Sequence, residues 1–272
     1  MKSTKPKSNK EQQLQLKAGK KHAWFIEEIP KFKVDIPIVK AATLYLSEFD
    51  ENKIDLSALL NDLRQFGAGD RITLVFNSPG GLVTEGKAII NTIKRTGSDI
   101  QTEIISSAAS MAAIMFCIGD RRLVHENSTI MFHNYRGGVI GKGHEMEQRL
   151  EHMQRNLPAF FRANIIGLTD EEINQMFDGK DFWFGAKEMA KRGIATHIIV
   201  DNVYIPAKDY IKVLKKAQKE AKKEGINIKS IEEAMGYGID VLSEIVQEQN
   251  ESIEEITAII SEAVTSNELL YN

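Results

Sequence analysis

Between about residue 24 and residue 200, two hydrophobic patterns take turns along the chain. Residues 37–49 and 71–78 are rich in apolar and β-branched residues, which is typical of strands, whereas residues 53–66 place apolar side chains at helical spacing. A strand, a helix and a second strand in this order predict a βαβ unit. Because parallel strands need crossover connections, which helices supply, we expect a parallel sheet covered by helices.

The same alternation predicts the other elements of this region. They are a helix from about Thr84, a strand over 100–106, a helix from about Ser110, strands over 121–126 and 128–135, a long helix-like segment interrupted by Pro158, a helix that starts at Thr169, a strand over 181–184, a helix over 186–192 and a strand over 194–200. At Thr169, the glutamate three residues later completes a capping box. The fold class is therefore α/β.

Composition divides the chain into three zones. Residues 1–22 hold seven lysines, one glutamate and almost no apolar pattern, so we expect a basic, disordered arm. Residues 23–200 form the α/β domain, and residues 201–272 are almost wholly helix-like. With 272 residues, of which 42% are hydrophobic, the chain is long enough for one core plus these extensions.

Charge and cysteine content narrow the class of protein. The net charge of −3 argues against a general attraction to nucleic acid or to anionic membranes. A single cysteine cannot form an intramolecular disulfide, and the sequence contains neither a secretory leader nor an apolar run of about 18 residues. We therefore expect a cytoplasmic protein that does not bind a membrane.

The last zone separates its charges. Residues 201–229 contain eight lysines and four acids, whereas residues 230–272 contain ten acids and neither lysine nor arginine, so two helices of opposite charge can pair. Apolar residues follow one helix face in the acidic part, which suits a partner helix, another subunit or packing on the chain's own domain. They are Leu242, Ile245, Val246, Ile253, Ile256, Ile260 and Val264.

Three places carry candidate chemistry. Residues 77–81, Asn-Ser-Pro-Gly-Gly, are either a plain turn or a site whose backbone amides stabilise negative charge. Ser110 lies where a strand meets a helix, either as small packing filler or as a nucleophile beside free helix amides. His133 lies near the end of a predicted strand, either as a structural histidine or as a proton acceptor.

Other chemistries are disfavoured by the sequence. Cys117 lies in an apolar stretch about two helical turns after Ser110, which is typical of a packed core thiol rather than a nucleophile. The cysteine and histidine spacings of zinc sites do not occur, so we expect no metal, and Ser110 lacks the G-x-S-x-G elbow of α/β-hydrolases. The sequence has no Walker-type phosphate loop, so any use of ATP must lie in a partner.

Four motifs, in their order and spacing, resemble the proteolytic subunits of the ATP-dependent Clp protease family. They are FNSPGGLVTEG, SSAASMAA, NSTIMFHNYRGG and KDFWFGAKEMAKRGIATHII, and the resemblance covers residues from about 40 to 200. It implies a spiral of βαβ units, a fold shared with the crotonases, with a protruding strand-helix handle made by residues 136–143 and the long helix after them. The helical C-terminal extension has no counterpart in the compact family pattern.

The resemblance also implies site residues. Ser110, His133 and Asp181 match the Ser-His-Asp triad of a serine protease, with Asp178 as a nearby competitor for the third position. In such a triad the serine attacks a peptide carbonyl, the histidine accepts its proton and the aspartate holds the imidazole. The matching oxyanion and substrate-binding positions are Gly80, Gly81, Met111, Gly137 and Gly138, with the oxyanion amides on Gly81 and Met111.

The implied activity is peptide-bond hydrolysis without a cofactor, on unfolded proteins or peptides. The resemblance further implies a homo-oligomer, as one ring of six or seven subunits or two stacked rings, with an AAA+ unfoldase as a partner. This chain departs from the family pattern near the expected substrate cleft, at Ser106, Ser107, Ala112, Asn134 and Tyr135. A phage head-maturation protease of the same type is the first alternative. A crotonase-like acyl-CoA enzyme and a non-catalytic scaffold are the alternatives from other classes.

Overall fold

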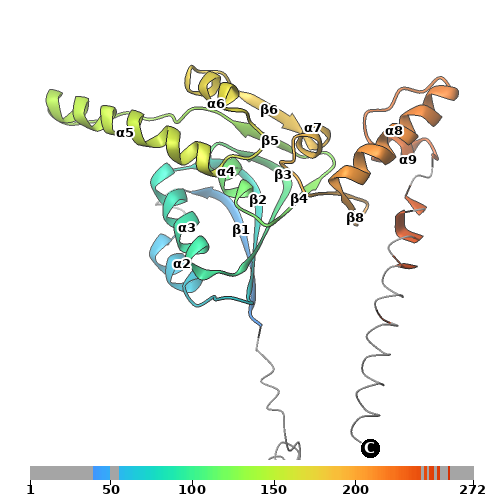
Figure 1. Cartoon of the computed structure of the whole chain (residues 1–272), viewed down its shortest axis with the longest axis horizontal. Helices are drawn as coiled ribbons and strands as arrows, with labels where there is room; N and C mark the ends of the chain where they lie inside the picture. Colours follow the sequence, from blue (N-terminus) through green and yellow to red (C-terminus); the bar gives the residue numbers. More distant parts are fainter. Residues whose placement is uncertain are drawn as a thin grey trace, which may run out of the picture. The chain divides into compact units, whose positions relative to one another are not determined.

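The computed structural model describes residues 39–49 and 55–239, with a few further residues between 242 and 257. The arm expected over residues 1–22 lies outside these residues. The described strands are β1 (Ala41–Phe49), β2 (Arg71–Gly81), β3 (Asp99–Ala109), β4 (Arg121–His125), β5 (Thr129–Phe132), β6 (Phe182–Gly185), β7 (His197–Val200) and β8 (Val203–Pro206). The described helices are α2 (Leu56–Leu63), α3 (Val83–Thr96), α4 (Met111–Cys117), α5 (Gly143–Asn164), α6 (Asp170–Phe177), α7 (Ala186–Lys191), α8 (Ala207–Lys223) and α9 (Ile231–Gly236) (Figure 1).

The strands form one sheet in the order β1-β2-β3-β4-β7-β8, and β5 pairs with both β3 and β6. The pairs from β1 to β4, and the pair of β4 with β7, are parallel, as the βαβ pattern predicted. β6 and β8 run antiparallel to their partners, so the sheet is mixed rather than wholly parallel. β8 follows β7 after Asp201 and Asn202, whose positive φ angles of 46° and 64° suit the tight turn of a hairpin.

Three stretches differ from the sequence prediction. Residues 203–206 form a strand in the zone expected to be helical, because the hairpin turn returns them to the edge of β7. Helix α5 continues through Pro158, with Leu157 and Phe161 buried on either side of it. Residues 133–142 form no strand, although the helix of the predicted handle is present. A strand needs a neighbouring strand for its backbone groups, and the described part of this chain supplies none there.

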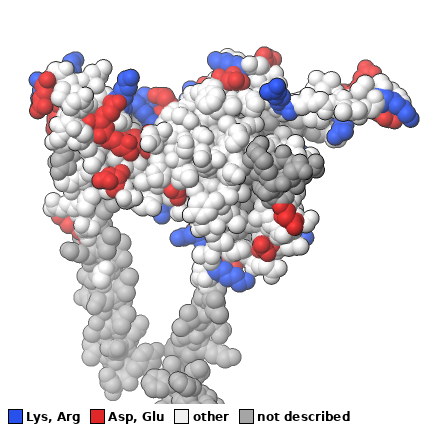
Figure 2. Space-filling model, turned by 180° about the vertical axis from the view of Figure 1, so that it is seen from behind, with Lys and Arg blue, Asp and Glu red and all other residues white. Residues whose placement is uncertain are grey.

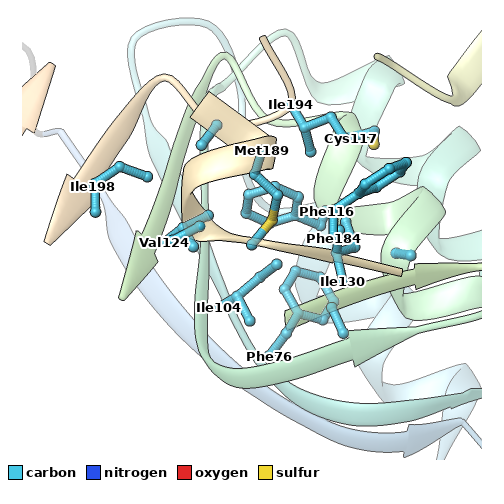
Figure 3. Close-up of a cluster of buried hydrophobic side chains, with 14 of the residues drawn as sticks. Phe76, Ile104, Phe116, Cys117, Val124, Ile130, Phe184, Met189, Ile194 and Ile198 are labelled. Atoms are coloured by element: carbon cyan, nitrogen blue, oxygen red, sulfur yellow. The ribbon is translucent and has the colours of Figure 1, made fainter. Parts of the chain in front are cut away.

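Helices α2, α3 and α4 cover one face of the sheet, and the core lies beneath them (Figure 1). Every residue of α4 is buried, so this helix is held inside the domain along its whole length. Figure 3 shows the centre of the core, where side chains from β2, β3, α4 and α7 meet. The labelled residues are Phe76, Ile104, Phe116, Cys117, Val124, Ile130, Phe184, Met189, Ile194 and Ile198.

The opposite face of the first three strands exposes large apolar side chains on β1 and β3, whereas Val75 on β2 between them is buried. Tyr45 on β1 is 77% exposed and Ile105 on β3 is 41% exposed. Trp183 on β6 is also largely exposed. Among the described residues, no helix is long and apolar enough to cross a membrane.

Helix α6 is stabilised at its N-terminus by a capping box and by hydrogen bonds from Arg192. The predicted capping box is confirmed, because Glu172 N–H donates to Thr169 Oγ1 (3.2 Å) and Thr169 N–H donates to Glu172 Oε2 (2.9 Å). Arg192 donates two hydrogen bonds of 3.0 Å to the same carboxylate, and its guanidinium lies over the Phe184 ring. The hydrogen bond from Arg192 is the largest cause that lowers the pKa of Glu172.

A buried carboxylate ties α8 and α9 to the α/β domain. Glu126, in the loop between β4 and β5, is 7% exposed. It accepts hydrogen bonds from the Tyr210 hydroxyl of α8 (2.6 Å) and from the backbone N–H groups of Ile231 and Glu232 (2.7 Å each), where α9 begins. Burial and the nearby Glu126 carboxylate raise the pKa of Tyr210 and the pKa of Glu232. The extension therefore supplies three donors to a charge buried in the domain.

Candidate active site

Ser110 occupies a strained backbone position between the end of β3 and the start of α4. Its φ of 58° and ψ of −125° lie outside the regions usual for a residue with a side chain. Such a conformation costs on the order of 1–3 kcal/mol and persists only where its surroundings enforce it. Here the Ser110 N–H donates to the Met131 carbonyl of β5 (2.9 Å), and buried α4 follows at once. Hydrolases use a strained strand-to-helix turn of this kind to expose a nucleophilic serine.

The end of β2 lies directly against Ser110. β2 continues to Gly81, through residues for which the sequence predicted a turn. Gly80 has a φ of 104°, and a Cβ atom on it would lie only 2.8 Å from the Ser110 Cβ. Only glycine permits this approach and this φ. The buried Ser78 hydroxyl accepts a hydrogen bond from the Gly80 N–H (3.1 Å) and so fixes the strand end against the serine.

The Met111 amide, one of the two assigned to the oxyanion site, lies directly after Ser110 at the start of α4. Met111 is the first residue of α4, so its N–H has no acceptor within the helix. A Cβ on Gly80 would lie 3.1 Å from the Met111 nitrogen, which shows how close the end of β2 comes to the start of α4. The structure does not bring the other two predicted glycines to the serine. Gly137 and Gly138 are exposed, and a Cβ on either would meet open space.

His133 and Asp181 lie just beyond the paired ends of two neighbouring strands. β5 and β6 pair antiparallel with Phe132 opposite Phe182. His133 directly follows Phe132, and Asp181 directly precedes Phe182. On its other side β5 pairs with β3, whose next residue is Ser110. The three predicted triad positions thus lie at the ends of neighbouring strands, namely β3, β5 and β6.

The triad side chains are not hydrogen-bonded to one another in this chain. The His133 side chain is half-buried and the Asp181 side chain is exposed, and no hydrogen bond joins Ser110, His133 and Asp181, all of which are described. The competitor Asp178 lies at the C-terminal end of α6 and has no such register with His133. The strand ends therefore place the three residues in one region of the sheet without a hydrogen bond between their side chains.

Asn134 anchors the segment that follows His133. Its Nδ2 donates to the Phe177 carbonyl at the end of α6 (2.9 Å), so the residue after His133 is tied to the loop that leads to Asp181. The Asn134 Oδ1 is buried and has no hydrogen-bond partner among the described residues. The sequence marked Asn134 only as a departure from a family pattern, and Ser78 only as part of a motif. The contact of Asn134 leaves no signal in local residue spacing, whereas Ser78 and Gly80 are two residues apart, a spacing typical of a serine side chain that bonds to its own backbone.

Other reactive groups do not form a competing site with Ser110. Burial raises the pKa of the Cys117 thiol to about 11, which confirms the prediction of a packed core thiol. His125 Nε2 lies 3.0 Å from Glu103 Oε1, but Glu103 is seven residues before Ser110 on β3, or about 23 Å along the strand. No group of three His, Cys, Asp or Glu side chains in the described region is arranged to hold a metal ion.

Comparison with known proteins gives consistent results. The family model described as Clp protease matches residues 42–202. The chain is 32% identical over 154 residues to the ATP-dependent Clp protease proteolytic subunit 1 of Leifsonia xyli subsp. xyli, which covers 55% of this chain and 77% of that protein. It is 31% identical over 146 residues to the ATP-dependent Clp protease proteolytic subunit 2 of Chlamydia pneumoniae, which covers 51% of this chain and 67% of that protein.

Proposed function

This chain belongs to the Clp protease family and is a serine-type endopeptidase, and we propose that Ser110, His133 and Asp181 are its catalytic triad. One observation carries the proposal. A serine in a strained backbone conformation is held against a glycine that no other residue can replace without a clash. The register of β5 and β6 supports the choice of His133 and Asp181 as its partners.

The chemistry assigns one step to each side chain. Ser110 Oγ attacks the carbonyl carbon of a peptide bond while its proton passes to the His133 imidazole. The tetrahedral intermediate collapses when His133 returns that proton to the leaving amine, which leaves an acyl-enzyme ester on Ser110. A water molecule, deprotonated by His133, then hydrolyses the ester. Asp181 holds the imidazole in the required tautomer and stabilises the imidazolium.

The backbone amides of Gly81 and Met111 would stabilise the oxyanion of the intermediate. An amide donor positioned for such an oxyanion lowers the barrier by about 3–4 kcal/mol in well-studied proteases. The free N–H of Met111 and the close approach of Gly80 to the Met111 nitrogen support this assignment. Gly137 and Gly138 would contact substrate as part of the extended segment after His133, by pairing of backbone groups with a bound peptide.

Assembly would complete the arrangement that the single chain leaves open. The chain forms a homo-oligomeric ring of six or seven subunits, single or in a stacked pair, in which residues 133–142 gain a partner strand. The exposed Tyr45 and Ile105, and the exposed first half of α5, support contacts between subunits. Ordering residues 133–142 would restrain His133, which the hydrogen bond from Asn134 to Phe177 already holds in place. An AAA+ unfoldase would deliver unfolded protein, because the chain itself carries no phosphate loop.

Labelling with a fluorophosphonate tests the nucleophile. The reagent forms a covalent adduct only with an activated serine, so mass spectrometry of the full-length chain should find the label on Ser110. Ser110→Ala should abolish both labelling and hydrolysis of a fluorogenic peptide. Ser8→Ala, a change of the same size within residues 1–22, should keep both. Labelling of a different serine, or peptide hydrolysis that survives Ser110→Ala, would contradict the assignment.

A further inference from the structure

Helix α8 presents a row of lysines on the side opposite to the one it buries. Lys208, Lys215, Lys219 and Lys222 follow the spacing i, i+7, i+11 and i+14, which sets four ammonium groups along one side of the helix over about 21 Å. Lys223 lies beside the last of them. All five side chains are exposed, and within the described residues none of them has an ion-pair partner. These five residues are called the lysine row below.

The lysine row is held on a fixed support. The opposite side of α8 packs into the core, with α7, β7, β8 and α9 as neighbours. Its buried residues are Ala207, Tyr210, Leu214, Ala217 and Ala221. The hydrogen bond from Tyr210 to Glu126 further fixes the rotation of the helix. Like charges at this spacing repel one another, so a rigid row of them favours an anionic partner.

The chain itself contains a segment of matching charge. Glu244, Glu248, Glu251 and Glu255 follow the spacing i, i+4, i+7 and i+11, which corresponds to one face of a helix. The described residues of this part, from Ser243 to Thr257, are helical. Residues 230–272 contain no lysine or arginine that would compensate these acids within the segment. Residues 240–262 are called the acidic segment below.

Where it is described, the acidic segment lies on a different part of its own chain. Leu242, Ser243, Val246, Gln247, Asn250 and Glu251 line a groove together with Asp201, Val203 and Met235 of the β7–β8 turn, β8 and α9. No residue of the lysine row lines this groove. Seen from behind, both basic and acidic side chains lie over the end of the molecule that α8 and α9 form (Figure 2). The lysine row and the acidic segment thus occupy separate parts of the extension, which suits recognition between copies.

We propose that the lysine row of α8 is a docking surface for the acidic segment of a second copy of this chain. Each exposed ion pair between the two contributes little by itself, but several pairs on one rigid helix act together. Salt screens such contacts, because the Debye length falls from about 10 Å at 0.1 M to about 3 Å at 1 M. Docking of the acidic segment on the lysine row therefore adds a salt-sensitive contact to the oligomer, distinct from any contact made through the sheet face or α5.

Zero-length cross-linking with a carbodiimide tests the contact in the unmodified full-length chain. The reagent joins a lysine to a carboxylate only when the two are in contact, and a gel then separates covalent dimers from single chains. We expect peptides that join the lysine row to the acidic segment in the dimer band and not in the single-chain band. Such peptides found in the single-chain band, or in neither band, would overturn the proposal.

Charge reversal supplies an independent test. One variant carries Lys208→Glu, Lys215→Glu, Lys219→Glu and Lys222→Glu, and the other carries Glu244→Lys, Glu248→Lys, Glu251→Lys and Glu255→Lys. In sedimentation at low salt, each variant alone should associate about ten- to a hundredfold more weakly, and an equimolar mixture should recover much of the association.

The control reverses Lys2, Lys5, Lys7 and Lys10 in the same way, which changes the net charge equally outside the lysine row. It should associate like the unchanged chain. If association recovers only when both sets of changes are combined in one chain, and not in the mixture, the lysine row binds the acidic segment of its own chain. Weakening equal to that of the control would mean that the lysine row has no partner of this kind.

Discussion

Replacing Tyr210 by phenylalanine isolates what one hydroxyl contributes to the buried Glu126 carboxylate. The Tyr210 ring is 1% exposed and should keep its packing, so the change removes only the 2.6 Å hydrogen bond to Glu126. A hydrogen bond to a charged group contributes about 1.5–3 kcal/mol. The carboxylate keeps the two backbone donors at the start of α9, so we expect a loss of about 2 kcal/mol in the free energy of unfolding.

The assay is denaturant and thermal unfolding of the full-length chain. A loss of this size should lower the melting temperature by about 4–8 °C for a chain of this length. The control is Tyr237→Phe, because Tyr237 is 61% exposed and its loss of a hydroxyl should change the unfolding free energy by less than about 0.5 kcal/mol. If the two substitutions have the same effect, the Glu126 contact carries no net stability and the reasoning fails.

A double-mutant cycle with Glu126→Gln sharpens the test. In the Glu126→Gln background the partner charge is gone, so Tyr210→Phe should cost measurably less than in the unchanged chain. Equal costs in both backgrounds would refute a direct coupling. The dependence of stability on pH above about 10 gives a second test of the same contact. The raised pKa of Tyr210 keeps its proton in the folded state, so its contribution is present below the ordinary tyrosine pKa of about 10 and is lost as the pH rises further. Tyr210→Phe should flatten that decline.

Three further predictions concern the site, the acid limb and the arm. Ser110→Ala should lower peptide hydrolysis by about 10⁴-fold or more with little change in stability. Adding His133→Ala should lower the activity little further, because triad residues act as one unit. If a peptidase assay instead shows two modest losses that multiply, the residues do not share a proton transfer. The Arg192 hydrogen bond that lowers the pKa of Glu172 stabilises the fold above the ordinary glutamate pKa and is lost as the pH falls through the lowered value. Glu172→Gln should therefore reduce stability at pH 7, and the difference from the unchanged chain should shrink in urea titrations at more acidic pH. Deleting residues 1–22 should leave peptidase activity and melting temperature nearly unchanged, and a large loss of either would contradict a non-packing arm.

The elements with a strong local pattern could be predicted from the sequence, and those set by distant partners could not. The capping box at Thr169 needs only residues three positions apart, and it is present as predicted. The strand β8 depends on the turn at Asp201 and on the free edge of β7, which no local pattern reveals. Pro158 normally ends a helix, but burial of the residues around it outweighs the lost backbone hydrogen bond in α5.

The site shows the same division. Ser110, His133 and Asp181 were chosen from motifs, and the pairing of β5 with β6 is consistent with that choice without testing it. Two features that fix the site arise only in three dimensions, because they depend on how separate elements meet. They are the positive φ of Ser110 and the contact of Asn134 with Phe177. The hydrogen bond from Gly80 to Ser78 is local, because the two residues are only two positions apart on β2.

The buried Glu126 has a consequence for the synthesis of the chain. Its last backbone donor, the N–H of Glu232, lies 106 residues later in the sequence. At a synthesis rate of about 5–20 residues per second, the ribosome needs about 5–20 s to make that stretch. During this interval the strands up to β5 can already meet, yet the carboxylate beside them has neither Tyr210 nor α9 to satisfy it. A nascent chain therefore carries an unfinished protease domain until its C-terminal extension has left the ribosome, and a chain cut short before residue 231 keeps that charge without either backbone donor.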